Sequence, residues 1–232
     1  AKEASKKNKG VKEIFTFDPV EDAKSWSIVK EKGEGKDAAV LQKLMDAVKP
    51  EDLLTLIYTS GTTGRPKGVM LTHHNIISNI KSTDRGNYFG LMDGDRTLSF
   101  LPLCHIYERT TIYIYLFYRA STYYAESMET IADNIKEVKP SMFASVPRLL
   151  EKVYDKILAK GNELTGIKRK LFFGAIEFGL QYDPMVKLGL IDSMKLAFYR
   201  RLIFSKWREA LGGNVRLIAS GSAALQPRLS RV

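Results

Sequence analysis

The chain has 232 residues, of which 44% are hydrophobic and 27% are charged, and its formal net charge is +10. These proportions are those of a folded protein and exclude an intrinsically disordered chain. The single cysteine, Cys104, excludes an internal disulfide, and no apolar run approaches the about 20 residues that a membrane-spanning helix needs.

The excess of basic residues favours anionic partners, which include nucleotides, acidic lipids and nucleic acids. Part of the charge lies in the first residues, which contain Lys2, Lys6, Lys7, Lys9 and Lys12. We expect residues 1–10 to be a disordered basic leader. The alternative for the charge as a whole is a solvated basic face without a specific partner. A lone cysteine suits a reducing compartment, so we expect a cytoplasmic protein that can touch the inner membrane face as a peripheral protein.

Taken in chain order, the first predicted elements are a short strand at 14–17 and a helix at 37–48, which Pro50 ends. An apolar run at 53–58 predicts a buried strand, followed by a loop at 59–68 and a helix from about 72 to 81. The next predicted elements are strands at 97–103, 121–125, 142–146 and 215–219, and helices at 108–118, 128–138, 148–159 and over much of 168–211. This alternation predicts an α/β fold with a mostly parallel sheet and flanking helices.

The loop at 59–68 has the most informative composition, with three glycines, four hydroxyl side chains and a lysine after a predicted strand: Tyr58-Thr59-Ser60-Gly61-Thr62-Thr63-Gly64-Arg65-Pro66-Lys67-Gly68. Glycines let backbone N–H groups converge on an anion, hydroxyls add donors, and Lys67 adds positive charge, so the loop suits a polyphosphate. It is not a Walker A loop, because Gly68 rather than Ser or Thr follows Lys67. An ordinary flexible loop is the alternative.

Two further segments follow predicted strands, where α/β sheets place ligand-binding groups. The first is Leu-Pro-Leu-Cys-His-Ile-Tyr-Glu-Arg, which ends at Arg109 and contains His105. The second is Ser-Gly-Ser-Ala-Ala-Leu, in which Gly221, Ser222 and Ala223 form a turn of small residues that can lie flat against a planar ring. A histidine satisfied in the core and a simple tight turn are the alternatives for these two segments.

The basic segment 194–211 carries an apolar stripe of Leu196, Tyr199, Ile203, Trp207 and Leu211. It is compatible with a helix on an acidic membrane or with a face that packs on the core. The adjacent residues His73 and His74 lack a carboxylate or cysteine that would complete a metal site, so we assign no metal ligands.

The loop string resembles the phosphate-binding signature of the adenylate-forming superfamily, and the segments around His105 and at 142–150 resemble its long-chain fatty acyl-CoA ligases. The resemblance implies that the loop holds ATP phosphates through Thr59, Ser60, Gly61, Thr62, Thr63, Gly64 and Lys67. It implies that Gly221, Ser222 and Ala223 contact the adenine and that His105 lies beside the carboxylate that is activated. It further implies ATP, Mg²⁺ and coenzyme A as cofactor and co-substrates, and a fatty acid as substrate.

The same family has a small C-terminal domain and an acidic magnesium ligand for which we find no counterpart. We therefore expect residues 11–232 to be an incomplete ATP- and acyl-binding domain that is inactive alone. A naturally short, non-catalytic nucleotide-binding module remains the main alternative. A nucleic-acid binder would explain the charge, but the sequence contains no recognised RNA- or DNA-binding motif, so we expect no nucleic-acid partner. The sequence does not determine the oligomeric state.

Overall fold

The computed structural model describes residues 2–8, 10–60, 64–84, 88–183 and 185–231. The chain divides by compactness into Ala1–Pro50 and Glu51–Val232, which we call unit 1 and unit 2. This division differs from the expectation of one domain from residue 11 onward.

Unit 1 is built from short elements. They are α1 (Lys2–Lys7), β1 (Phe15–Thr16), β2 (Lys24–Ser25), α2 (Ser27–Gly33) and α3 (Ala38–Asp46). The strands β1 and β2 pair in parallel, and the side chain of Asp37 caps α3 by accepting a hydrogen bond from the backbone N–H of Ala39 at 2.9 Å. The predicted strand at 14–17 and helix at 37–48 are confirmed. We expected the basic leader to have no regular structure, but Lys2–Lys7 form helix α1. Lysine and alanine are good helix formers.

Unit 2 begins with an antiparallel hairpin of β3 (Leu53–Thr59) and β4 (Lys67–Thr72), followed by α4 (His73–Asp84). The sequence predicted a buried strand, a loop and a helix, so the second strand was missed and β3 is less buried than expected. Most of β3 is exposed or half-buried, and Ile57 is its buried residue. Thr72 ends the hairpin and starts α4: its Oγ1 accepts from the N–H of Asn75, and the Asn75 side chain accepts from the N–H of Thr72.

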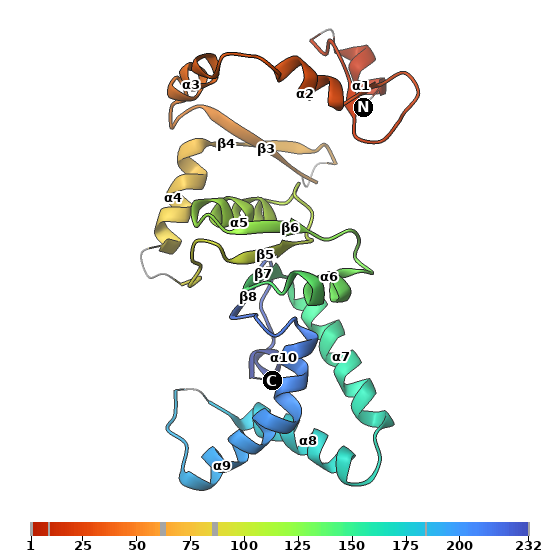
Figure 1. Ribbon diagram of the computed structural model, residues 1–232, viewed down its shortest axis with the longest axis vertical. Coiled ribbons are helices and arrows are strands. Elements are labelled where there is room, and N and C mark those ends of the chain that lie inside the picture. The colour runs from red at the N-terminus through yellow and green to blue at the C-terminus, as the bar shows by residue number, and fades with distance from the viewer. Residues whose placement is uncertain (1, 9, 61–63, 85–87, 184, 232) are drawn as a thin grey trace. The chain divides into compact units, whose positions relative to one another are not determined.

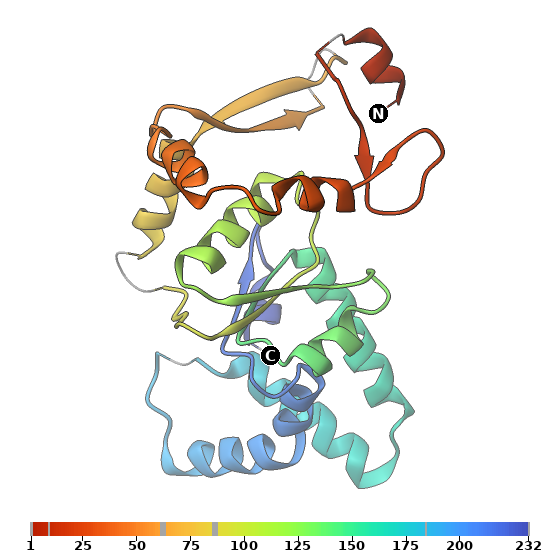
Figure 2. The same cartoon turned by 45° about the horizontal axis from the view of Figure 1, so that its top comes forward.

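In the described part of unit 2, four strands form a parallel sheet in the order β6-β5-β7-β8 (Figure 1). Their bounds are Arg96–Ser99 for β5, Ser121–Tyr124 for β6, Met142–Ser145 for β7 and Leu217–Ser220 for β8. The predicted α/β class with a mostly parallel sheet is confirmed, and Figure 2 shows the strands side by side from a second direction.

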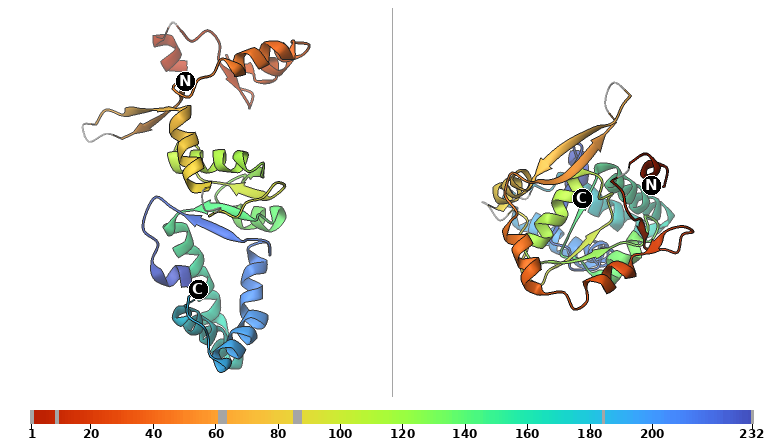
Figure 3. Two further views of the ribbon diagram at one scale, coloured as in Figure 1. Left: turned by 90° about the vertical axis from the view of Figure 1, so that its left-hand side faces the viewer. Right: turned by 90° about the horizontal axis from the view of Figure 1, so that it is seen from above.

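The helices of unit 2 alternate with these strands. They are α5 (Ile106–Phe117), α6 (Ile131–Val138), α7 (Pro147–Glu163), α8 (Gly166–Gln181), α9 (Leu190–Tyr199), the π-helical turn η1 (Arg200–Phe204), α10 (Ser205–Ala210) and α11 (Pro227–Arg231). Between β7 and β8 the chain passes through α7 to α10, which form a helical layer of their own before β8 returns to the sheet (Figure 3). No helix within the described residues is both long and apolar enough to cross a membrane.

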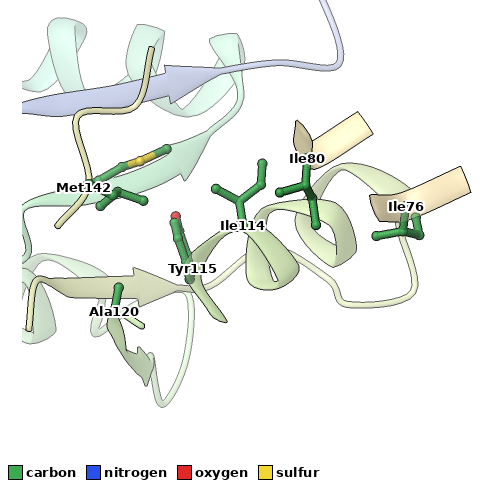
Figure 4. Packing of buried hydrophobic residues seen from close by; sticks show 7 residues of the cluster. Ile76, Ile80, Ile114, Tyr115, Ala120 and Met142 are labelled. Carbon is green, nitrogen blue, oxygen red and sulfur yellow. The ribbon is translucent and has the colours of Figure 1, made fainter. Parts of the chain in front are cut away.

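The sheet has a separate apolar cluster on each face because neighbouring residues of a strand point to opposite sides. On one face Met142 packs with residues of α4 and α5, among them Ile80 and Tyr115 (Figure 4). On the other face Phe143 and Leu98 pack against α6. This two-sided coverage holds the strand ends, and with them the loops that follow, in fixed positions.

Helices α7 and α8 meet at a contact that depends on a glycine. A Cβ placed on Gly161 would lie 2.2 Å from Cε1 of Phe172. We expect Gly161→Ala to lower the free energy of unfolding by about 1–3 kcal/mol through overpacking, although alanine is the better helix former. Urea unfolding followed by circular dichroism measures the effect. Adding Phe172→Leu should restore part of the stability, and a single variant as stable as the wild type would contradict the tight contact.

Candidate functional site

The candidate site lies beyond the carboxyl ends of the parallel strands. The strands β5, β7 and β8 each end in a serine: Ser99, Ser145 and Ser220. Ser145 and Ser220 are register partners on neighbouring strands. In parallel α/β sheets this edge is where ligands bind, since the loops that leave the strands surround a shared space.

Tyr107, in the first turn of α5, connects the segment after β5 to the segment after β8. Its hydroxyl donates a hydrogen bond to the backbone carbonyl of Ala219 at 2.9 Å. Its ring covers Gly221 so closely that a Cβ there would lie 2.5 Å from Cε2 and Cζ of the ring. The structure therefore brings together two of the sequence-predicted segments, although they are more than 100 residues apart in the chain.

The turn after β8 is shaped by its backbone. The N–H of Gly221 donates to the carbonyl of Ser145 at 3.2 Å, which continues the β7–β8 pairing by one residue. Ser222 then adopts a left-handed conformation with φ of +69°, and Ser222 and Ala223 are exposed. Ser222 and Ala223 are thus exposed small residues, whereas Gly221 is half-buried beneath the ring of Tyr107; the role of the turn in binding adenine stays a prediction.

His105 occupies the N-cap position of α5 with an extended backbone. Its carbonyl accepts from the N–H of Arg109 at 3.1 Å, while its side chain makes no capping hydrogen bond and is exposed. The imidazole is thus free to meet a ligand at the sheet edge, two residues before Tyr107. Arg109 is half-buried, and its Nε has no hydrogen-bond partner among the described residues.

Glu108 is a member of this region to which the sequence argument gave no role. Its carboxyl group is buried, with a side chain 1% exposed. One oxygen accepts from the Oγ of Ser99, and the other has no partner within the described residues. Burial raises the pKa of Glu108, and the hydrogen bond from Ser99 opposes that rise only in part. The signal available in the sequence was a carboxylate in the first turn of helix 106–117, directly before Arg109.

The carboxyl group of Glu108 affects the pKa of two tyrosines. Burial, followed by the charge of Glu108, raises the pKa of Tyr107 and of Tyr115 above that of an exposed tyrosine. Tyr115 is fully buried, and Figure 4 shows its hydroxyl pointing toward the strand that carries Met142. Helix α5 therefore carries a buried polar cluster, with Tyr107 and Glu108 in its first turn and Tyr115 in its third.

The predicted phosphate loop closes the β3–β4 hairpin. Lys67 is the first residue of β4 and pairs in register with Thr59, the last residue of β3. Thr59, Ser60, Gly64 and Lys67 are all exposed, and Gly64 has a φ of +77°. The predicted contacts Gly61, Thr62 and Thr63 lie outside the described residues. No hydrogen bond between described residues joins the hairpin loop to the Gly221 turn.

Acidic, histidine and cysteine side chains do not gather into a metal site: across residues 2–231, with the undescribed positions left out, no group of three or more could hold an ion. Cys104 is exposed. We therefore assign no residues to magnesium.

A family model for "AMP-binding enzyme" matches residues 1–231. The chain belongs to the AMP-binding enzyme family. Among its relatives, "Long chain acyl-CoA synthetase 6, peroxisomal" from Arabidopsis thaliana is 36% identical over 183 residues, covering 78% of this chain and 25% of the relative. "Long-chain-fatty-acid--CoA ligase 1" from Homo sapiens is 37% identical over 179 residues, covering 75% of this chain and 24% of the relative.

"Long-chain-fatty-acid--CoA ligase FadD15" from Mycobacterium tuberculosis is 35% identical over 202 residues, covering 86% of this chain and 33% of the relative. This AMP-binding chain therefore spans about a quarter to a third of the length of these relatives. Among solved structures, the adenylation domain of a carboxylate reductase from Mycobacterium chelonae aligns with a TM-score of 0.51 at 24% identity, covering 78% of this chain and 24% of that chain. This similarity supports the fold.

The buried Glu108 makes the stability of this AMP-binding domain depend on pH. Because the pKa of Glu108 is raised in the folded protein, its protonated form favours folding, and this contribution is lost as the pH rises through the folded-state pKa. Glutamine cannot ionise. We therefore expect the stability of Glu108→Gln relative to the wild type to rise with pH above the ordinary glutamate pKa of 4.5, by at most about 1.4 kcal/mol per pH unit, until the pH passes the folded-state pKa. Urea unfolding at several pH values measures this difference; a pH-independent difference would contradict it.

Proposed function

We propose that the protein activates a long-chain fatty acid with ATP and transfers the acyl group to coenzyme A. The observation that carries the proposal is the meeting of the His105 segment and the Gly221 turn at the carboxyl edge of the parallel sheet, through Tyr107. Family membership and the printed names of the relatives support the same reaction. The whole reaction requires groups that we do not assign here.

In the proposed first step, a carboxylate oxygen attacks the α-phosphorus of ATP, the bond to the β-phosphate oxygen breaks, and pyrophosphate leaves. This chain contributes binding and orientation. Lys67 and the hydroxyls of Thr59 and Ser60 hold phosphate oxygens, and Gly221 with its neighbours supports the adenine. His105 orients the fatty acid carboxylate from the opposite side of the turn.

In the proposed second step, the thiol of coenzyme A attacks the acyl carbonyl carbon, the acyl–phosphate bond breaks, and AMP leaves with the electron pair while the thiol loses its proton. Magnesium would neutralise phosphate charge when it is bound with ATP. Since the described residues offer no cluster for the ion, we derive no step from it.

We propose a cytoplasmic location with peripheral contact to a membrane, where long-chain fatty acids are available. The exposed single cysteine and the net charge of +10 support this location. The printed name of one relative specifies peroxisomes, so fractionation of cells that express the tagged full-length protein is the direct test of the compartment.

Replacing Lys67 tests the phosphate loop. We expect Lys67→Ala to lower kcat/KM for ATP in the ATP–pyrophosphate exchange reaction of the full-length protein by about ten- to a hundredfold, because one hydrogen bond from a charged group is lost. Lys81→Ala is the matched control, since Lys81 is an exposed lysine in the last turn of α4. Exchange without fatty acid dependence, or unchanged kinetics in Lys67→Ala, would contradict the proposal. Nucleotide binding without any exchange would favour the non-catalytic module.

Replacing His105 tests the acyl side of the site. We expect His105→Ala to raise KM for the fatty acid about tenfold while KM for ATP changes less than threefold, because the imidazole is proposed to contact the carboxylate rather than the nucleotide. Steady-state kinetics with both substrates varied separate the two effects. His74→Ala, on α4, is the control. An equal rise in both KM values would instead indicate a role in shaping the whole sheet edge.

A further inference from the structure

Helix α9 has an apolar face that the rest of the described structure leaves exposed. Leu190, Met194 and Phe198 of α9 and Leu202 of η1 are spaced four residues apart and form one row along these two consecutive helical segments. Their exposed fractions are 80%, 67%, 48% and 39%. Ile191 lies beside this row and is 70% exposed. A contiguous apolar row of this kind marks an interaction surface more often than isolated exposed residues do.

The opposite face of the same helix already supplies the packing that the fold needs. Leu196, Tyr199 and Ile203 are half-buried, and the ring of Tyr199 lies 5.7 Å from that of Phe178 on α8. Trp207, farther along, packs edge-on against Phe172 of α8. The stripe identified in the sequence is therefore the core-facing one. The exposed row is a second apolar face of the same segment, and packing in the core does not account for its apolar side chains.

The charge around the exposed row is mostly positive. Residues 185–208 contain six basic side chains and one acidic side chain. Lys195 follows Met194 and Arg201 precedes Leu202, so the two basic residues fall in the helical rows on either side of the apolar one, and both are exposed. The acidic residue, Asp192, pairs with Lys195 at 3.2 Å on the surface, where such pairs contribute little.

We propose that α9 and η1 dock on the surface of an anionic phospholipid membrane. Leu190, Met194 and Phe198 enter the boundary between headgroups and acyl chains, while Lys195 and Arg201 lie level with the lipid phosphates. A helix that lies in the interface has this combination of an apolar row and basic flanks, and long basic side chains can extend toward phosphates while their stems stay on apolar surface.

This inference extends the proposed function by naming the surface through which the enzyme would reach a substrate that dissolves in bilayers. The membrane-docking inference rests on the proposed function only in naming the fatty acid as the substrate reached through this surface. Membrane binding is measured without nucleotide or turnover, so failure of one proposal is distinguishable from failure of the other.

The test is sedimentation of the full-length protein with sucrose-loaded vesicles of phosphatidylcholine, with and without about a third of phosphatidylglycerol as the anionic component. Phe198→Gln should lower the partition coefficient on the anionic vesicles by about tenfold, because an apolar side chain no longer leaves water. Lys195→Gln should lower it about fivefold on anionic vesicles and leave binding to neutral vesicles unchanged. Raising the salt concentration should reduce the effect of Lys195→Gln.

The chain offers a matched control for each variant. Phe117, on α5, is 47% exposed and packs edge-on against Tyr118, as Phe198 packs edge-on against Tyr199. Lys136, on α6, is 57% exposed and pairs with an aspartate three residues earlier, and Lys195 is 56% exposed with the same arrangement. Phe117→Gln and Lys136→Gln should bind vesicles as the wild type does.

Three outcomes would overturn the proposal. The first is a wild type that sediments equally little with and without anionic lipid, and the second is an equal loss of binding in the Phe198 and Phe117 variants. The third is a concentration-dependent dimer, detected by analytical ultracentrifugation without lipid and abolished by Phe198→Gln, which would show that a second copy covers the face. Specific loss in Phe198→Gln and Lys195→Gln supports docking of α9.

Discussion

The hydrogen bond from Tyr107 to the carbonyl of Ala219, together with the packing of its ring on Gly221, is the constraint on which the candidate site depends. Strands β5 and β8 are not neighbours, because β7 lies between them. The start of α5 must therefore reach across the end of β7 to meet the turn after β8. Tyr107 has the length to make that reach, and Gly221 has no side chain to oppose it. The buried carboxyl group of Glu108 and its hydrogen-bond partner Ser99 hold the first turn of α5 against the end of β5.

The parallel sheet and its helices follow from local patterns. The apolar runs that become β5 and β7 are short and lie between helical stretches, so their alternation alone predicts βαβ units. Pro147 begins α7 at the position where its fixed φ and missing N–H suit a helix start. The strand predicted at 97–103 ends earlier, at Ser99, because the chain turns at Pro102 before α5 begins at Ile106.

Local patterns did not predict the β3–β4 hairpin or the burial of the Glu108 carboxyl group. Gly68 suggested loop, yet it lies in β4, where the ring of Tyr58 on the paired strand covers it at 3.2 Å from the position of a Cβ. The ring of Tyr58 covers Gly68 only after β3 and β4 have paired. Glu108 is similar: its burial requires Ser99 at the end of β5 to meet α5. The sequence predicted that the segments around His105 and Gly221 carry ligand-binding residues. The contact between these two segments depends on strand order, which local patterns do not contain.

The register of the hairpin also separates two properties of the loop at 59–68, namely its length and the position of Lys67. Lys67 is held opposite Thr59 by the ladder of β3 and β4, and the ladder continues through Tyr58 and Gly68. Insertions within 60–66 would enlarge the bend while the lysine kept its place beside the last hydroxyl of β3. Removing one residue from β4 itself would reverse which side of the ribbon each following side chain faces.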